Sequence, residues 1–130
     1  MFTAESVRQA TKARRISDLL ALTDQHRELW RELQERPELR RITQKDVDLV
    51  AEQITSAEDQ FLNLAIVHFN TGWLLTREGA LLTQEALIKD VQFFFNLPIP
   101  RSVWERTRGN RDPEFAGFIE SCLRRKRSGS

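Results

Sequence analysis

Two histidines and one cysteine are the residues best suited to metal or acid–base chemistry. His26 lies between Leu22 and Trp30 at helical spacing, and His68 lies in the most apolar stretch of the chain. Together with Cys122 they would supply three ligands that zinc accepts, but zinc sites usually include a short-spaced Cys-x-x-Cys or His-x-x-x-His pair. No such pair is present. We therefore expect no metal site and interpret both histidines as structural, while whether they meet in space stays open.

No residue stands in a pattern typical of a catalytic nucleophile or a cofactor site. None of the serines has a Gly-x-Ser-x-Gly context, and no phosphate loop, Gly-x-Gly-x-x-Gly or His-Glu-x-x-His occurs. Cys122 lies on an apolar helical stripe, which is typical of an inert buried thiol. The sequence thus predicts a protein that is not an enzyme, with no catalytic residue and no cofactor.

Basic clusters and aromatic residues are the stronger signal, and they define a candidate interaction surface. Arginines surround a proline turn near a tryptophan, more basic residues close the chain, and a phenylalanine run precedes the turn. The candidate residues are Phe93, Trp104, Arg101, Arg106, Arg124, Arg125, Lys126 and Arg127. The basic groups could contact phosphates, and Trp104 could offer a stacking face to a base.

The overall charge argues against nucleic acid as the first hypothesis. The chain has 20 Lys and Arg against 19 Asp and Glu, whereas nucleic-acid-binding domains tend to be clearly basic. A nucleic-acid-associated role is therefore the second hypothesis, and a domain near an anionic membrane surface is the third. The first is a non-enzymatic helical module for protein interaction or regulation, with a homodimer at tens of micromolar as one form of it.

The consecutive residues Phe93, Phe94 and Phe95 bear on that first hypothesis. Residues in a helix turn about 100° each, so three neighbouring rings cannot all face one side. At least one ring must lie at the rim of the core, against another helix, another subunit or a partner.

The spacing of apolar residues predicts an all-α fold. The 130 residues suit one domain, and no alternating strand pattern or hairpin turn is present. We expect a compact domain of five to six helices, with a long N-terminal helix and a central apolar helix at about 57–77. Residues 1–15 would be its polar, projecting start, 16–123 the helical domain, and 124–130 a flexible basic tail.

Capping residues predict where several helices begin and end. The first helix would run from Thr3 to Arg36, because Pro37 follows it, and Thr43 would start a second helix that stops near Thr55. Thr55-Ser-Ala-Glu58 has the pattern of a capping box that opens the central helix.

Further signals follow the central helix. Gly79 would cap its end in the left-handed conformation, and Thr83 would start a fourth helix. Pro100 would lie at the first position of a short helix, after an extended turn at residues 97–100. Asp112-Pro113 would start the last helix, as an N-cap followed by a proline.

The compartment is inferred from cysteine usage and hydropathy. A single cysteine cannot form an internal disulfide, which suits a reducing compartment. No apolar run approaches the roughly 18–20 residues that span a bilayer, and the start of the chain lacks a signal-peptide core. We therefore expect a cytoplasmic domain with no membrane span in this chain.

In its motifs the chain resembles a family of small helical bacterial domains of unknown function. The motifs are LTDQHRELW (22–30), RPEL (36–39), AEDQF (57–61) leading into VHF (67–69), FFNLPIPRSVW (94–104) and DPEF (112–115). Members of such families often follow an N-terminal membrane helix, so an anchor would be absent here or would precede this chain. The resemblance implies an all-α fold and no activity, ligand or site residue.

Overall fold

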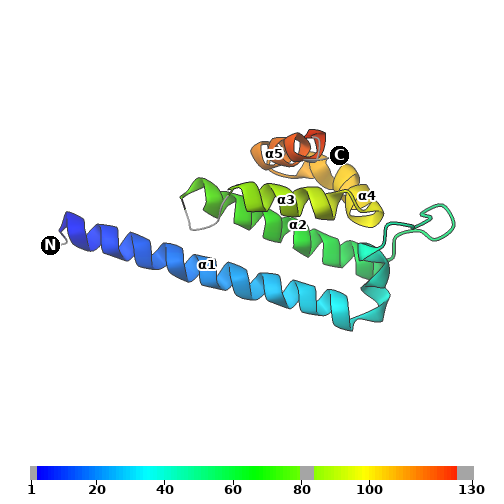
Figure 1. Cartoon of the computed structure of the whole chain (residues 1–130), viewed down its shortest axis with the longest axis horizontal. Helices are drawn as coiled ribbons and strands as arrows, with labels where there is room; N and C mark the ends of the chain where they lie inside the picture. The colour runs from blue at the N-terminus through cyan, green and yellow to red at the C-terminus, as the bar shows by residue number, and fades with distance from the viewer. Residues whose placement is uncertain (1–2, 80–83, 126–130) are drawn as a thin grey trace.

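A computed structural model describes residues 3–79 and 84–125, and these ranges contain helices and no strand (Figure 1). The predicted all-α fold is therefore confirmed. In chain order the elements are the α-helix α1 (Ala4–Glu35), the 3-10 helix η1 (Pro37–Thr43), α2 (Ser56–Arg77), α3 (Gln84–Phe95), α4 (Pro98–Thr107), the 3-10 helix η2 (Arg108–Asn110) and α5 (Pro113–Arg124).

The helix α2 is the centre of the domain, as its apolar sequence predicts. It packs against α1 on one side and against α3 and α4 on another, and α5 packs on α3. Because α2 is apolar on two sides, it needs a packing partner on each side, and these helices provide them. In Figure 1, α1 lies along one side of α2, and α3, α4 and α5 lie on the other.

The long helix α1 begins at its predicted cap and extends beyond the rest of the fold. The Thr3 side chain accepts a hydrogen bond from the backbone N–H of Ser6, and the helix ends before Pro37. Leu22 is the one buried residue of α1, and residues 4–15 are all exposed. Figure 1 shows this first third reaching past the ends of α2 and α3.

The second predicted helix, from Thr43 to Thr55, is wrong. Thr43 ends η1, and residues 44–55 form a loop. The Asp48 side chain accepts hydrogen bonds from the backbone N–H groups of Val50 and Ala51, and such local bonds compete with a helix. The backbone carbonyls of Glu52 and Gln53 accept from the Arg41 guanidinium, which fixes the end of the loop.

A buried carboxylate begins α2. Thr55 and Glu58 form the predicted capping box, and Glu58 is 1% exposed. Its oxygens also accept two hydrogen bonds from Arg41, at 2.9 and 3.1 Å. Burial acts to raise the pKa of this carboxyl, but the hydrogen bonds from Arg41 and the Thr55 backbone outweigh it, so the pKa is lowered. Glu58 is therefore an ionised, fully bonded group.

The remaining caps agree with the sequence except at one turn. Gly79 has a φ of 81°, and Asp112 accepts from the backbone N–H of Phe115. Thr83 lies outside the described residues. The short helix α4 begins at Pro98, not at Pro100, because Leu97 is extended and Pro98 already has the φ of a first helical position.

The Arg41–Glu58 pair generates the first prediction. We expect Arg41→Ala to lower the free energy of unfolding by about 3 kcal/mol, because it leaves a buried carboxylate without its partner. Urea denaturation followed by circular dichroism measures this change. Arg40→Ala is the control, because Arg40 is exposed and its loss should cost no more than about 0.5 kcal/mol. Equal effects of the two substitutions would contradict the role given to the pair.

Candidate functional site

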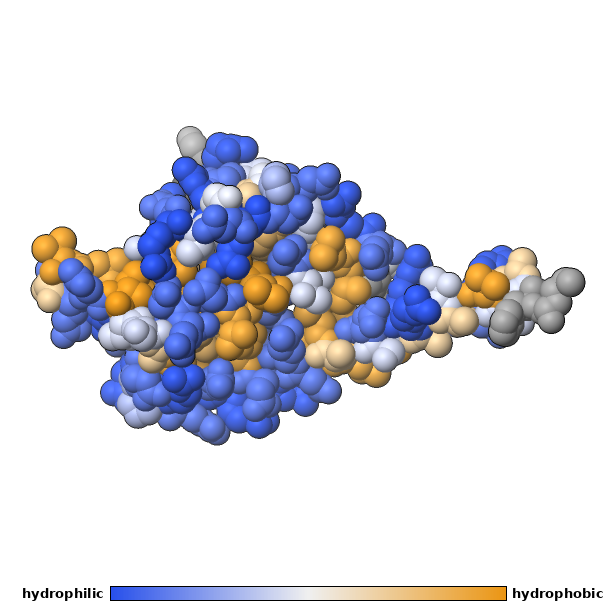
Figure 2. Space-filling view, turned by 180° about the vertical axis from the view of Figure 1, so that it is seen from behind, coloured by the Kyte–Doolittle hydropathy of each residue, from blue (hydrophilic) through white to orange (hydrophobic). Residues whose placement is uncertain are grey.

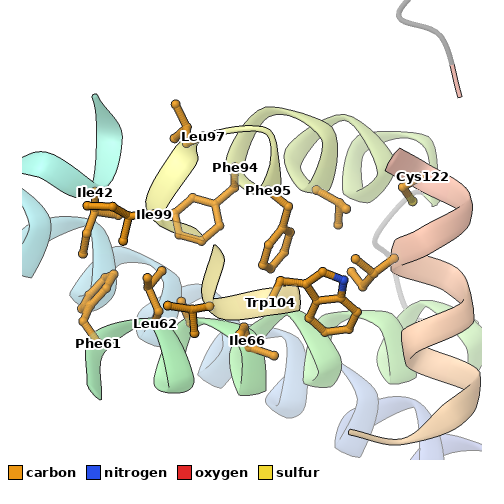
Figure 3. Close-up of a cluster of buried hydrophobic side chains, with 14 of the residues drawn as sticks. Ile42, Phe61, Leu62, Ile66, Phe94, Phe95, Leu97, Ile99, Trp104 and Cys122 are labelled. Carbon is orange, nitrogen blue, oxygen red and sulfur yellow. The ribbon is translucent and has the colours of Figure 1, made fainter. Parts of the chain in front are cut away.

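Trp104 does not lie on an interaction surface, so this part of the prediction is wrong. It is fully buried, and its ring packs on Phe95 and Phe115 at centroid distances of 5.8 and 5.9 Å. Its indole N–H donates to the Glu120 carboxylate at 3.0 Å. Figure 3 shows the Trp104 ring among the core side chains, with its nitrogen toward α5.

The predicted arginines near the proline turn are exposed but have acidic partners within the domain. Arg101 pairs with Glu105 at 3.1 Å, and Arg106 pairs with Asp59. Arg108, their neighbour, pairs with Glu120 at 2.9 Å. These contacts neutralise the positive charge that a phosphate would need.

The terminal basic residues are only partly described. Arg124 and Arg125 are exposed at the end of α5, where positive charge complements the helix dipole. Lys126 and Arg127 lie outside the described residues. Arg41, another basic residue of the sequence, is engaged with Glu52, Gln53 and Glu58.

Phe93 is the predicted aromatic residue that the structure leaves on the surface. It is 51% exposed, whereas Phe94 is 4% exposed and Phe95 is fully buried. This is the division that the helical spacing of the three rings requires. Phe93 lies at one edge of a depression between α1 and α3, for which α2 forms the floor.

We call this depression the α1–α3 groove. It consists of two adjoining hollows of about 80 and 190 Å³, which share His26, His68, Phe69 and Asp90. Trp30 adds to the α1 wall, and Phe93 adds to the α3 wall. The groove is open to solvent because α1 packs on α2 and η1, while α3 packs on α2, α4 and α5.

The two histidines meet at the floor of the groove and link α1 to α2. His26 Nδ1 and His68 Nε2 are 3.1 Å apart. The Trp30 indole lies 2.9 Å from His26 Nε2, and the Gln25 amide oxygen lies 3.0 Å from His68 Nδ1. The four side chains therefore form one continuous chain of hydrogen bonds.

The indole of Trp30 determines where every proton in this chain lies. An indole N–H can only donate, so His26 Nε2 accepts and His26 Nδ1 carries the proton. His26 Nδ1 then donates to His68 Nε2, and His68 Nδ1 donates to the Gln25 oxygen. Both imidazoles are neutral in this arrangement, and every ring nitrogen has a partner. Neither histidine has a nitrogen left for a metal ion or a substrate.

Burial governs the electrostatics of the groove. Burial, and after it the nearby His26, lowers the pKa of His68 to about 4. Partial burial raises the pKa of the Asp90 carboxyl, and a positive charge on His26 would act against this shift. Asp90 has no hydrogen bond or ion pair with another described residue. The groove thus presents one unmatched carboxyl beside aromatic surface.

Cys122 lies apart from the histidines, buried on α5. Burial raises the pKa of its thiol to about 11, which makes it a poor nucleophile. Within residues 3–79 and 84–125, no three histidine, cysteine or acidic side chains are placed to hold a metal ion together. None of the helices in these ranges combines the length and apolar character needed to cross a membrane.

A second apolar surface lies on the opposite face of the domain. Leu64, Val67 and Leu74 of α2 are about half exposed. Figure 2 shows hydrophobic residues gathered in a band over α2, between the hydrophilic surfaces of α1 and α5. The groove differs from this band because it combines apolar walls with an unmatched carboxyl, and we therefore take the groove as the candidate site.

Sequence reasoning missed both Asp90 and Gln25. One signal was present for the histidine pair, because His26 lies on the same helical stripe as Leu22, Leu29 and Leu33, which must face a neighbour. No local signal marks Asp90, whose role depends on how α3 lies relative to α1. Comparison of the chain with protein-family models, with curated proteins and with solved structures finds no match.

The histidine chain generates the second prediction. His68 binds a proton in the unfolded chain below pH 6.5 but in the folded protein only near pH 4. Stability should therefore be greatest above pH 6.5 and should fall as the pH is lowered toward 4. We expect this histidine to account for a loss of about 2 to 3 kcal/mol between pH 7 and pH 4.5.

Urea denaturation of the wild type and of His68→Gln at both pH values measures the effect. The variant should be less stable at pH 7 and should lose less stability on acidification than the wild type. An equal loss in the two proteins would show that His68 is not the group that titrates.

Proposed function

We propose that this protein is a non-enzymatic interaction module that binds an amphipathic α-helix in the α1–α3 groove. The observation that carries this proposal is the exposed Phe93 ring beside the unmatched Asp90 carboxyl, over an apolar floor. Two helices form walls and a third forms the floor, which is the geometry of helix-in-groove recognition. Apolar side chains of the incoming helix would fill the hollows, and a basic residue would pair with Asp90.

A regulatory module of this kind needs no catalytic residue. The ring nitrogens of both histidines are accordingly occupied by hydrogen bonds within the domain. The proposal includes a cytoplasmic location, because the buried free thiol of Cys122 suits a reducing compartment. Nucleic-acid binding and contact with an anionic membrane surface are the alternatives. The ion pairs of Arg101, Arg106 and Arg108 favour neither of them.

Salt dependence of oligonucleotide binding separates these alternatives and is the third prediction. Binding through six to ten phosphates would weaken about 10³- to 10⁵-fold between 50 and 200 mM salt. We expect no such tight and salt-dependent binding to random duplex or single-stranded oligonucleotides in fluorescence anisotropy. Micromolar binding at physiological salt that is lost when Arg124, Arg125, Lys126 and Arg127 are changed to Gln would favour the nucleic-acid alternative.

Site-specific photocrosslinking tests the proposed function directly and is the fourth prediction. A photoreactive phenylalanine analogue at position 93 should crosslink a polypeptide in the cell, because this position borders the groove. The same analogue at position 50 is the control, since Val50 is a 94% exposed apolar residue in the 44–55 loop. Absence of an adduct at position 93, or equal adducts at both positions, would argue against the groove as the binding site.

A further inference from the structure

Building on the proposed function, we infer that the helix bound in the α1–α3 groove is the projecting start of α1 from a second copy of this chain. The two copies would form a symmetric antiparallel dimer, in which residues 4–15 of each cover residues 22–33 of the other. Three features of α1 support this arrangement: its length, the exposed apolar residues near its middle and its charges.

The lengths of the two segments match. The projecting segment is residues 4–15, and the groove runs along α1 between Leu22 and Leu33. Each spans about 18 Å at a rise of about 1.5 Å per residue. A projecting segment of this length is marginal as an isolated helix in water, so packing on a second copy would stabilise it. Antiparallel pairing of these segments places the two-fold axis between residues 18 and 19.

One face of α1 connects the groove with this axis. Ile16, Thr23 and Trp30 are seven residues apart, so they lie along one face of α1. Thr23 and Trp30 line the groove, whereas Ile16 is 41% exposed beyond its end. Leu20, on the same side, is 62% exposed. These two exposed residues lie on either side of the axis, where they would pack against their equivalents in the partner.

Unmatched charges on the two segments are opposite. Among the described residues, Lys12, Arg14 and Arg15 of the projecting segment make no ion pair, and neither does Asp90. Antiparallel pairing brings residues 12–15 of one copy opposite residues 22–25 of the other, and Asp90 borders the groove beside Leu22 and Thr23. The basic segment of each copy would thus neutralise the carboxyl of its partner. A symmetric dimer satisfies both sites at once.

Sedimentation equilibrium of the full chain at 1–100 µM tests this dimer. We expect a dimer at tens of micromolar, and we expect Ile16→Glu to weaken its dissociation constant about 10- to 100-fold, because it places a charge at the axis. Val67→Glu is the matched control. Val67 is a 52% exposed apolar residue of α2, in the band on the face opposite the groove. This control should change the dissociation constant less than about threefold.

A charge exchange tests the contact with Asp90. Asp90→Lys should weaken the dimer at least about tenfold, because the lysine would face the basic segment, and adding Lys12→Glu should restore part of the loss. Circular dichroism of each variant verifies that the domain is folded. A mass of 15.2 kDa across the concentration range would overturn the inference, and so would a dimer unaffected by Ile16→Glu and Asp90→Lys.

These results are separable from a failure of the proposed function. A monomer whose position 93 crosslinks a different polypeptide overturns the second copy as the occupant and leaves the groove as a binding site. A dimer that is disrupted by Ile16→Glu, with an adduct of two copies at position 93, supports both proposals.

Discussion

The buried carboxylate of Glu58 is the constraint on which the first half of the fold depends. It closes the first turn of α2, and its negative charge holds the Arg41 guanidinium in place. Arg41 in turn binds the carbonyls of Glu52 and Gln53, so one charge pair fixes the end of η1, the loop and the start of α2. This fixed turn lies between α1 and α2, which pack on each other, and the groove stays open because α3 packs on α2, α4 and α5.

The chain of hydrogen bonds through His26 and His68 fixes how α1 and α2 lie relative to each other. Apolar contacts between two helices permit some sliding, whereas four side chains with one allowed arrangement of protons set the register between α1 and α2. The cost is sensitivity to acid, because a proton added to either ring removes an acceptor and places two donors against each other. The same link therefore fixes the register of α1 and α2 at neutral pH and weakens their contact at acidic pH.

The parts of the fold that could be predicted from the sequence are those set by neighbouring residues. The capping box at Thr55, the left-handed Gly79 and the Asp112-Pro113 start are local, and so is the division of the three phenylalanines. The loop at residues 44–55 could not be predicted, because Arg41 reaches its carbonyls across the fold. Trp104 was misplaced for a related reason: Glu120, which accepts its N–H, comes from α5. The groove and Asp90 depend on three helices at once, and no local pattern describes them.

Only part of α1 packs against α2. The free energy of local opening should therefore differ between the two parts of this one continuous helix. Backbone amides near Leu22 are held by contacts with α2, so their hydrogen exchange would require a large opening of the domain. Residues 4–15 are all exposed among the residues that the structure describes, so their amides would exchange through local fraying. The boundary between slow and fast exchange would then fall inside an unbroken helix, at the residue where its neighbour ends, and not at a cap or a turn.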